Sequence, residues 1–448
     1  MTVDGVESQI AEWRAYVAKA PAVDGRDLDE LETHLRDQIA ELGAAGLASD
    51  EAFLVAVKRM GDLDALSREF AREHSGRLWK QLVLRGEDAP AHPSTGWFEA
   101  FAFAAAAAIA IQIARIAAGF PEESPVWLGR NIGLFVLPFL AGYFARRREL
   151  DTRRWVLTTA PLVLLALVVN LYPYAVDSAT EVLVALHLPI VLWFAVAYPY
   201  MGGTIESHER RMDFVRFTGE WIIYYVLIAL GGGVLMGLTA AILEPIGIDV
   251  ERLIEWVLPS GAAGAVIVAA WLVESKQHVV ENMAPVLTMI FTPLFALMLA
   301  IAAITYAVDG FAGAFDRELL GVFDALMVVV LGLVLYAMSA RDPSRAAGLM
   351  DRAQLLAVAS ALVLDVMVLI SMVARIGDLG FTPNRAAALG LNLVLLVNLA
   401  GAARLSLRFL RGRIAFARLE RWQTSYLPIF GLWTAIVVTV LPPLFTFT

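Results

Sequence analysis

Long apolar runs recur along the chain after residue 96, and each is long enough to cross a bilayer as a helix. A hydrocarbon core of about 30 Å requires roughly 20 apolar residues in helical form. These runs are continuously apolar rather than alternating, so they favour helices over the strands of a barrel. Eleven spans are predicted, at residues 97–118, 126–145, 155–172, 181–200, 219–243, 256–274, 283–307, 319–340, 353–374, 385–409 and 427–447. The sequence therefore predicts an all-α, polytopic membrane protein.

The first 84 residues show a different pattern, in which apolar positions recur at helical spacing among many charges. The spacing predicts helices over 3–20 and 27–42, a third capped by Ser49 and a fourth capped by Asp62. Residues 85–96 contain glycine and proline and predict a linker. We therefore expect a helical head at 1–84, a linker at 85–96 and a transmembrane domain at 97–448.

The head resembles a known domain type. A helix rich in leucine is followed by Gly46-Leu-Ala-Ser-Asp-Glu-Ala-Phe53 and then by Arg59-Met-Gly-Asp62. This order is similar to that of the permease-prefix (HAAS-type) helical domain, which precedes some bacterial permeases and occurs in related signalling proteins. The resemblance implies a regulatory or partner-binding module. The alternative is a capped bundle that only solubilises or orients the membrane part.

Charge supports this division and suggests an orientation. The chain is 59% hydrophobic and 18% charged, and its first 95 residues hold 29 of the charged side chains. No signal-peptide pattern opens the sequence, which favours a cytosolic head. With the head inside, 18 Arg and Lys residues of the membrane domain fall in inner loops and only 6 in outer ones. This asymmetry follows the positive-inside rule and predicts a multi-pass protein of the bacterial cytoplasmic membrane with an extracytoplasmic C-terminus.

Composition and motifs also narrow the chemistry. The absence of cysteine excludes disulfides, thiolate metal sites and cysteine nucleophiles. The net charge of −9 gives no indication of nucleic-acid binding. The chain has no zinc-protease, serine-hydrolase, phosphate-loop or haem-attachment motif. We therefore predict no cofactor and do not favour an enzyme.

Asp365 is the most informative single residue, because it falls near the centre of the ninth span. A carboxylate at that depth costs roughly 2.5–3.5 kcal/mol and usually faces protein or water. Counted inward from the outer loop, Asn392 and Asn398 of the tenth span bracket Asp365 by about one turn. The three residues predict a polar intramembrane site for a proton or cation. The alternative is a neutral Asp–Asn contact that only joins helices.

Further polar residues fall in the outer halves of their spans. If these side chains lie together, they line an outward-facing vestibule. If they lie apart, each one snorkels to the membrane surface or pairs with another residue at a helix interface. They are Arg115, Arg130, Asn170, His187 and Asp324.

Small residues repeat every four positions in the fifth span. Such a stripe predicts close helix packing, with a broken helix at a transport site as the alternative. The stripe consists of Ala229, Gly233, Gly237 and Ala241.

Glu274, His278 and Glu281 would share one helical face at the inner end of the sixth span, at spacing i, i+4, i+7. Their oxygen and imidazole ligands make a weak candidate for a divalent metal. A solvated helix face is the simpler interpretation of the same three residues.

The loop Arg375-Ile-Gly-Asp-Leu-Gly-Phe-Thr-Pro-Asn-Arg385 resembles a signature of an uncharacterised family of polytopic bacterial membrane proteins, catalogued as a domain of unknown function. Arg375, Gly380, Thr382 and Arg385 are the matching positions. Thr382 is suited to cap the tenth span, and Arg385 to hold an anionic group or a carboxylate. The loop is therefore either a structured turn or a binding site on the outer side.

Taken together, these features predict a permease-like protein that moves a small solute, ion or lipid under the control of its cytosolic head. A membrane signalling or envelope-stress sensor is the first alternative, and an intramembrane lipid-modifying enzyme is the second. The expected partners are the lipid bilayer, a cytosolic regulatory protein at the head and a second copy of the chain.

Overall fold

The computed structural model describes residues 4–17, 25–44, 47–60, 95–117, 125–176, 178–244, 250–275, 283–308, 317–341 and 345–448. The chain divides into two compact units, Met1–Pro93 and Ser94–Thr448. Every long regular element in the described residues is a helix. The protein is therefore all-α, as the apolar pattern predicts.

Three helices form the described part of the N-terminal unit: α1 (Asp4–Val17), α2 (Gly25–Ala44) and α3 (Ser49–Met60). Each contributes apolar side chains to one core, in which Trp13, Leu35 and Phe53 are buried. Three of the four helices predicted for the head are thus present. The fourth, expected from Asp62, and the linker as far as residue 94 lie outside the described residues.

Ion pairs join α1 to α2 on the polar side of the head. Arg36 donates to both carboxylate oxygens of Glu7 at 2.7 and 2.8 Å and to Glu32 at 3.0 Å. Arg14 of α1 also pairs with Glu32. The pKa of Glu32 is lowered by its hydrogen bond to Arg14, and that of Glu7 by its hydrogen bond to Arg36.

Eleven long helices and one short helix make up the part of the second unit that the structure describes. They are α5 (Thr95–Ala117), α6 (Pro125–Arg147), α7 (Thr152–Leu171), α8 (Ala179–Tyr200), α9 (His208–Leu243), α10 (Val250–Ser275), α12 (Met283–Val308), α13 (Arg317–Ser339), α14 (Leu349–Leu379), α15 (Pro383–Leu410), α16 (Phe416–Thr439) and α17 (Leu441–Leu444). Ten of the long helices, all except α16, are long and apolar enough to cross a membrane. The chain therefore has the architecture of a multi-pass membrane protein.

The helix α16 occupies the place of the eleventh predicted span, but it begins at Phe416 rather than at residue 427. Polar residues in its first half keep its mean hydropathy low. At that end the Phe416 ring lies 4.4 Å from the guanidinium carbon of Arg341, beside the α13–α14 connection. At the other end Tyr172, after α7, donates a 2.6 Å hydrogen bond to the Thr439 carbonyl. The helix α16 therefore runs between the same two ends of the unit as its neighbours.

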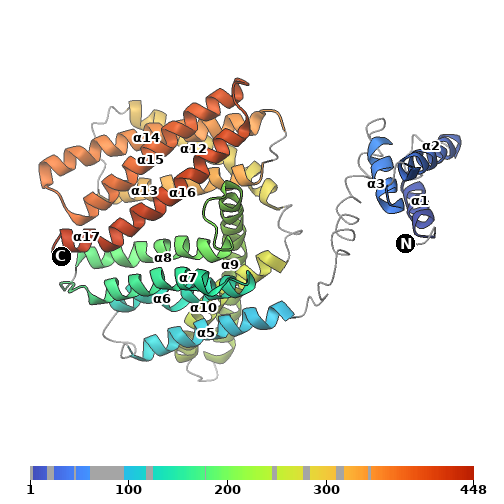
Figure 1. Ribbon diagram of the computed structural model, residues 1–448. Coiled ribbons are helices and arrows are strands. Elements are labelled where there is room, and N and C mark those ends of the chain that lie inside the picture. Colours follow the sequence, from blue (N-terminus) through green and yellow to red (C-terminus); the bar gives the residue numbers. More distant parts are fainter. Residues whose placement is uncertain are drawn as a thin grey trace. The chain divides into compact units, whose positions relative to one another are not determined.

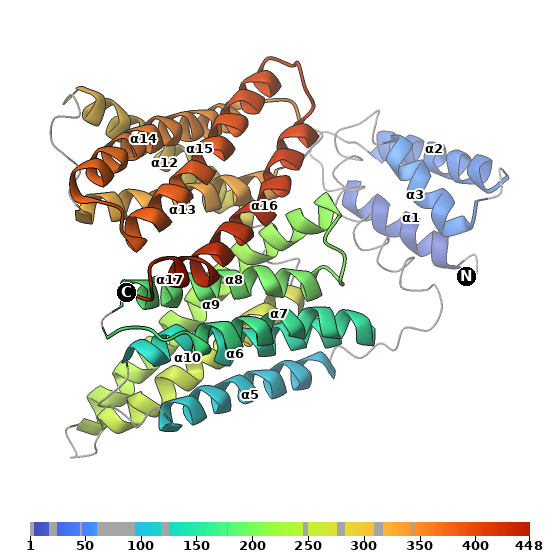
Figure 2. The same cartoon turned by 60° about the vertical axis from the view of Figure 1, so that its left-hand side comes forward.

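The membrane unit consists of two helical bundles, each with its own apolar core (Figures 1 and 2). The first bundle comprises α5–α8 and α10, packed around residues such as Leu140 and Ile267. The second bundle comprises α12–α16, packed around residues such as Leu364 and Leu395. In both views the cyan and green helices of the first bundle lie together, and so do the orange and red helices of the second.

The long helix α9 joins the two bundles through its first turns. Phe214 and Phe217 belong to the core of the first bundle, whereas Met212 and Val215 belong to that of the second. The later, strongly apolar half of α9 is mostly exposed on the protomer. The α9 helix is therefore a connecting element at its start and a surface element toward its end.

Candidate functional site

A polar set lies inside the apolar core of the second bundle. Asp365, near the middle of α14, and Asn392 and Asn398 of α15 are each 0% exposed, and Gln423 of α16 is 1% exposed. Asp324 of α13 is partly buried. We call these five residues the polar set. Four different helices of the second bundle supply these side chains.

Hydrogen bonds connect members of the polar set across helices. Asn392 Nδ2 donates to Asp324 Oδ1 at 2.8 Å and to the Ala388 carbonyl of its own helix at 2.9 Å. Asn398 Nδ2 donates to Gln423 Oε1 at 3.0 Å. The carboxylate of Asp324 also acts electrostatically on Asp365 of α14. The hydrogen bonds of the set thus join α15 to α13 and to α16.

The polar set has an excess of hydrogen-bond acceptors. Four of its buried oxygens have no hydrogen-bond partner among the described residues: Asp365 Oδ1, Asp365 Oδ2, Asn392 Oδ1 and Asn398 Oδ1. A buried polar atom without a partner is costly, so native proteins rarely leave one. All four atoms here require a donor or a cation. The set can therefore take up a proton, a water molecule or a cation.

The charges of the polar set also favour the uptake of a proton or a cation. A charged carboxylate at the centre of a membrane costs roughly 2.5–3.5 kcal/mol, and a second negative charge nearby adds repulsion. The Asp324 carboxylate acts on Asp365 in this way, and no cationic side chain contacts either carboxylate in the described part of the chain. A bound proton or cation would relieve both costs.

The outer polar residues do not form a single vestibule. In the first bundle, Arg130 of α6 pairs with Glu181 of α8 at 2.5 Å and donates to Asn170 of α7 at 3.3 Å. His187 Nδ1 lies 2.8 Å from the Leu183 carbonyl one turn back on α8. Asp324, by contrast, belongs to the polar set of the second bundle. The expected grouping of Arg130, His187 and Asp324 is therefore wrong.

Arg115 has a structural partner on α10. Pro259 lacks a backbone N–H, so the Glu255 carbonyl four residues earlier has no helical donor. The Arg115 guanidinium donates to this carbonyl, and Gln112 donates to the next one, of Trp256, at 2.7 Å.

A second arginine has the same role on α16. Pro428 leaves the Thr424 carbonyl without a helical donor, and Arg211 donates to this carbonyl at 3.2 Å.

The loop from Arg375 to Arg385 is a tightly hydrogen-bonded turn between α14 and α15. Thr382 caps α15, its hydroxyl accepting from the Arg385 N–H at 3.4 Å, and Gly380 has a φ of 81° that favours glycine. The Arg385 guanidinium donates to the carbonyls of Leu379 and Gly380 at 2.8 and 2.7 Å. Arg385 thus holds the end of α14, which favours the structured turn over a binding site.

Among the described residues, the small-residue stripe of α9 has no close neighbour. A Cβ added at Gly233 or Gly237 would have no neighbour within 4 Å, and Ala229 and Ala241 are exposed. The close approaches are elsewhere. A Cβ at Gly390 would lie 1.9 Å from the Trp433 ring, and one at Gly401 would lie 2.1 Å from the Trp422 ring.

The weak metal candidate is not supported at its one described member. Glu274 accepts from Arg148 Nη2 at 2.7 Å and from Tyr143 Oη at 3.2 Å, and Arg147 lies 3.5 Å away. His278 and Glu281 lie outside the described residues. In the part of the chain that the structure describes, no cluster of three or more His, Asp or Glu side chains is able to hold a metal ion.

Gln423 is the member of the polar set that sequence reasoning missed. The predicted eleventh span began at residue 427, which left Gln423 in an inner loop. Trp422 and Tyr426 are four residues apart, the spacing of neighbours on one helix face. This spacing is the signal in the sequence that the helix begins before residue 427. In the structure the two rings are in contact on α16.

A comparison with known proteins gives no match: no family model, curated protein or solved structure matches the chain. The two resemblances in the sequence therefore stay as expectations, and any functional proposal rests on the fold and the polar set.

Proposed function

We propose that the protein is a permease-like transporter of the bacterial cytoplasmic membrane, in which the polar set of the second bundle binds a coupling proton or cation at Asp365. The observation that carries this proposal is the presence of four buried oxygen acceptors without donors among transmembrane helices. An ionisable residue at such a depth commonly belongs to an ion or proton path.

The composition of the set indicates which ions suit it. Carboxylate and amide oxygens are the preferred ligands of hard cations, and the same atoms accept a proton equally well. No thiol or imidazole contributes, so a soft metal does not fit. The neighbouring Asp324, held by Asn392, supplies a second carboxylate that would strengthen the binding of a positive charge to Asp365.

The orientation and the head complete the proposal. Excess arginine on one side supports a cytosolic head and an extracytoplasmic C-terminus. The head, by its resemblance to permease-prefix domains, would receive a cytosolic signal and adjust transport. The transported solute, ion or lipid would move along the second bundle as its helices rearrange around the polar set.

Cation binding can be measured without knowing the substrate. We expect Na⁺ or Li⁺ to raise the midpoint of thermal unfolding of the detergent-solubilised full chain, because a ligand that binds only the folded state stabilises it. Asp365→Asn supplies its own donor and should remove this response. Glu181→Gln, an acid in the first bundle, is the matched control and should retain it. A response that persists in Asp365→Asn would contradict the proposal.

Water access distinguishes transport from sensing. The chain has no native cysteine, so Asp365→Cys and the neighbouring buried Leu364→Cys can be compared directly. A transporter predicts that the cysteine at 365 reacts with an aqueous thiol reagent from at least one side, while that at 364 does not.

A membrane sensor is the second candidate, because the Asp365 side chain is fully buried. If neither cysteine reacts in folded protein, the dry core favours this sensor.

A further inference from the structure

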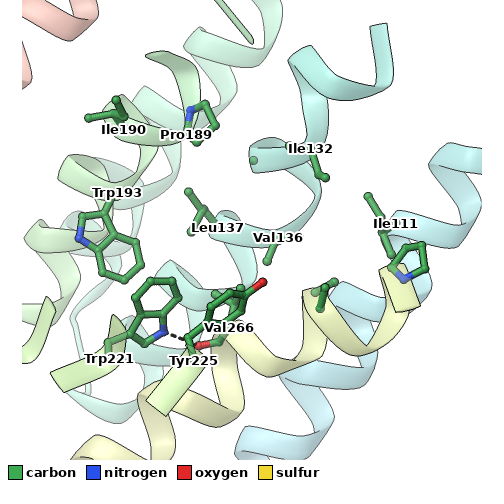
Figure 3. Close-up of a pocket in the computed structure, with 14 residues that line it drawn as sticks. Ile111, Ile132, Val136, Leu137, Pro189, Ile190, Trp193, Trp221, Tyr225 and Val266 are labelled. Atoms are coloured by element: carbon green, nitrogen blue, oxygen red, sulfur yellow. Dashed lines mark hydrogen bonds between the residues drawn. The ribbon is translucent and has the colours of Figure 1, made fainter. Parts of the chain in front are cut away.

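An apolar cavity lies in the first bundle, between α5, α6, α8, α9 and α10 (Figure 3). Its volume is about 490 Å³, which falls in the range of small-molecule sites, about 300–1,000 Å³. Trp193, Trp221 and Tyr225 gather at one end, and Ile111 and Ile132 lie at the other. The cavity is separate from the polar set, which belongs to the second bundle.

Two prolines and a glycine shape this cavity. Pro189 of α8 and Pro259 of α10 both line it, and each interrupts the hydrogen bonding of its helix and locally bends it. Gly133 of α6 allows a close approach to α8, since an added Cβ would lie 3.3 Å from Pro189 Cα.

The cavity opens toward the lipid-facing surface. Ile132 and Ile190 line it, yet they are 47% and 43% exposed, and Ala262 of α10 is also exposed. These residues lie within helices long and apolar enough to cross a membrane. The medium outside this opening is therefore the hydrocarbon of the bilayer rather than water.

The two indole N–H groups in the cavity wall already have hydrogen-bond partners within the protein. Trp221 Nε1 donates to the Val266 carbonyl at 2.8 Å, and Trp193 Nε1 donates to Thr218 Oγ1 at 3.2 Å. The remaining wall is almost entirely aliphatic or aromatic carbon. Water needs two to four polar partners to occupy such a space, and an apolar ligand does not.

We propose that the hydrocarbon chain of a lipid from the surrounding bilayer occupies this cavity. A chain entering between Ile132 and Ile190 restores the dispersion contacts that the walls would otherwise lack. The aromatic group at the far end closes the cavity, with ring centroids of Trp193 and Trp221 4.5 Å apart. The inference goes beyond the proposed transport function and does not depend on it, because no residue of the polar set takes part.

The test uses the full chain in vesicles of phosphatidylethanolamine and phosphatidylglycerol that carry a phospholipid with a photoreactive diazirine in its acyl chain. After illumination, mass spectrometry of peptides locates the adducts. We expect adducts on the cavity segments 189–193, 221–225 and 259–266. Ala262→Leu fills the cavity and should reduce these adducts about tenfold.

Ala105→Leu is the matched control, because Ala105 is exposed on α5 and does not line the cavity. It should leave the adducts unchanged. Ile190→Trp, at the opening, provides a second blocking variant if Ala262→Leu does not fold. Equal labelling of the cavity segments in wild type and a folded blocking variant would overturn the proposal. Labelling by a probe whose diazirine is in the headgroup, without labelling by the acyl-chain probe, would also overturn it.

Asp365→Asn separates this inference from the proposed function. It should abolish the stabilising effect of cations while leaving the acyl-chain adducts intact. Failure of the cation response therefore leaves the lipid site standing, and failure of the adducts leaves the cation site standing.

Discussion

Asn392 of α15 donates a 2.8 Å hydrogen bond to Asp324 of α13, two residues that lie 68 positions apart in the chain. The bond joins Asp324 to Asn392, and the Asp324 carboxylate also acts electrostatically on Asp365. The bond also leaves Asn392 Oδ1 as an acceptor without a donor. An ion or proton bound at Asp365 would therefore affect the packing of α13 against α15, which connects binding to helix movement.

The Asp324–Asn392 bond should give a measurable coupling energy. A double-mutant cycle of Asp324→Leu and Asn392→Leu should yield about 0.6 kcal/mol and at most about 1.7 kcal/mol, the average and the maximum for interhelical hydrogen bonds in a membrane protein. Reversible unfolding in mixed micelles provides the four free energies. Asn398→Leu, which breaks the bond to Gln423 instead, is the control and should be additive with Asp324→Leu. Zero coupling between Asp324 and Asn392 would show that the bond contributes nothing to stability.

The sequence is sufficient to predict most of the spans and three residues of the polar set, but not the other two residues of the set. Bilayer thickness fixes span length, and a lone carboxylate in an apolar run is conspicuous, so Asp365 and its two asparagines are found directly. Asp324 and Gln423 join them only through the packing of α13 and α16 against α14 and α15. Depth along a span does not specify which helices are neighbours.

The glycines illustrate the same limit. The regular stripe around Gly233 predicts packing, yet the tight contacts form at Gly390 and Gly401, which belong to no obvious repeat. Each of these faces a tryptophan of α16. A small residue is needed where a large one approaches, and the partner is set by the three-dimensional packing.

A pair of glycine substitutions tests this difference. Gly390→Ala would place a Cβ 1.9 Å from the Trp433 ring, so it should destabilise the protein by about 1–3 kcal/mol, as overpacking does. Gly233→Ala meets no atom within 4 Å and improves helix propensity, so it should be neutral or stabilising by up to about 1 kcal/mol. Thermal unfolding of both variants in detergent checks the prediction. The two variants losing equal stability would contradict it.

Arg115 and Pro259 should be coupled through the Glu255 carbonyl. Arg115→Leu leaves this partly buried acceptor without a donor and should cost about 1 kcal/mol. Pro259→Ala restores a backbone N–H that can satisfy the same carbonyl from within α10. Arg115→Leu should therefore cost clearly less in the Pro259→Ala background, as measured by unfolding midpoints of the four proteins. An identical cost in both backgrounds would exclude this role of Arg115.

The head should lose stability in acid because Glu7 and Glu32 have lowered pKa values in the folded state. A lowered pKa means that the unfolded state binds protons first, so the stabilisation is present above the usual value of 4.5 and is lost as the pH falls below it. Hydrogen exchange of the full chain, corrected for intrinsic rates, should show weaker protection of the helices α1–α3 below pH 4.5 than above it. Glu32→Gln should reduce protection at neutral pH and make protection less dependent on pH, because Arg14 and Arg36 then lose a charged partner.

Glu41→Gln is the control, because Glu41 is an exposed acid on the same helix. This variant should retain the wild-type dependence of protection on pH. Protection that is equal on both sides of 4.5 in the wild type would show that these ion pairs do not stabilise the head.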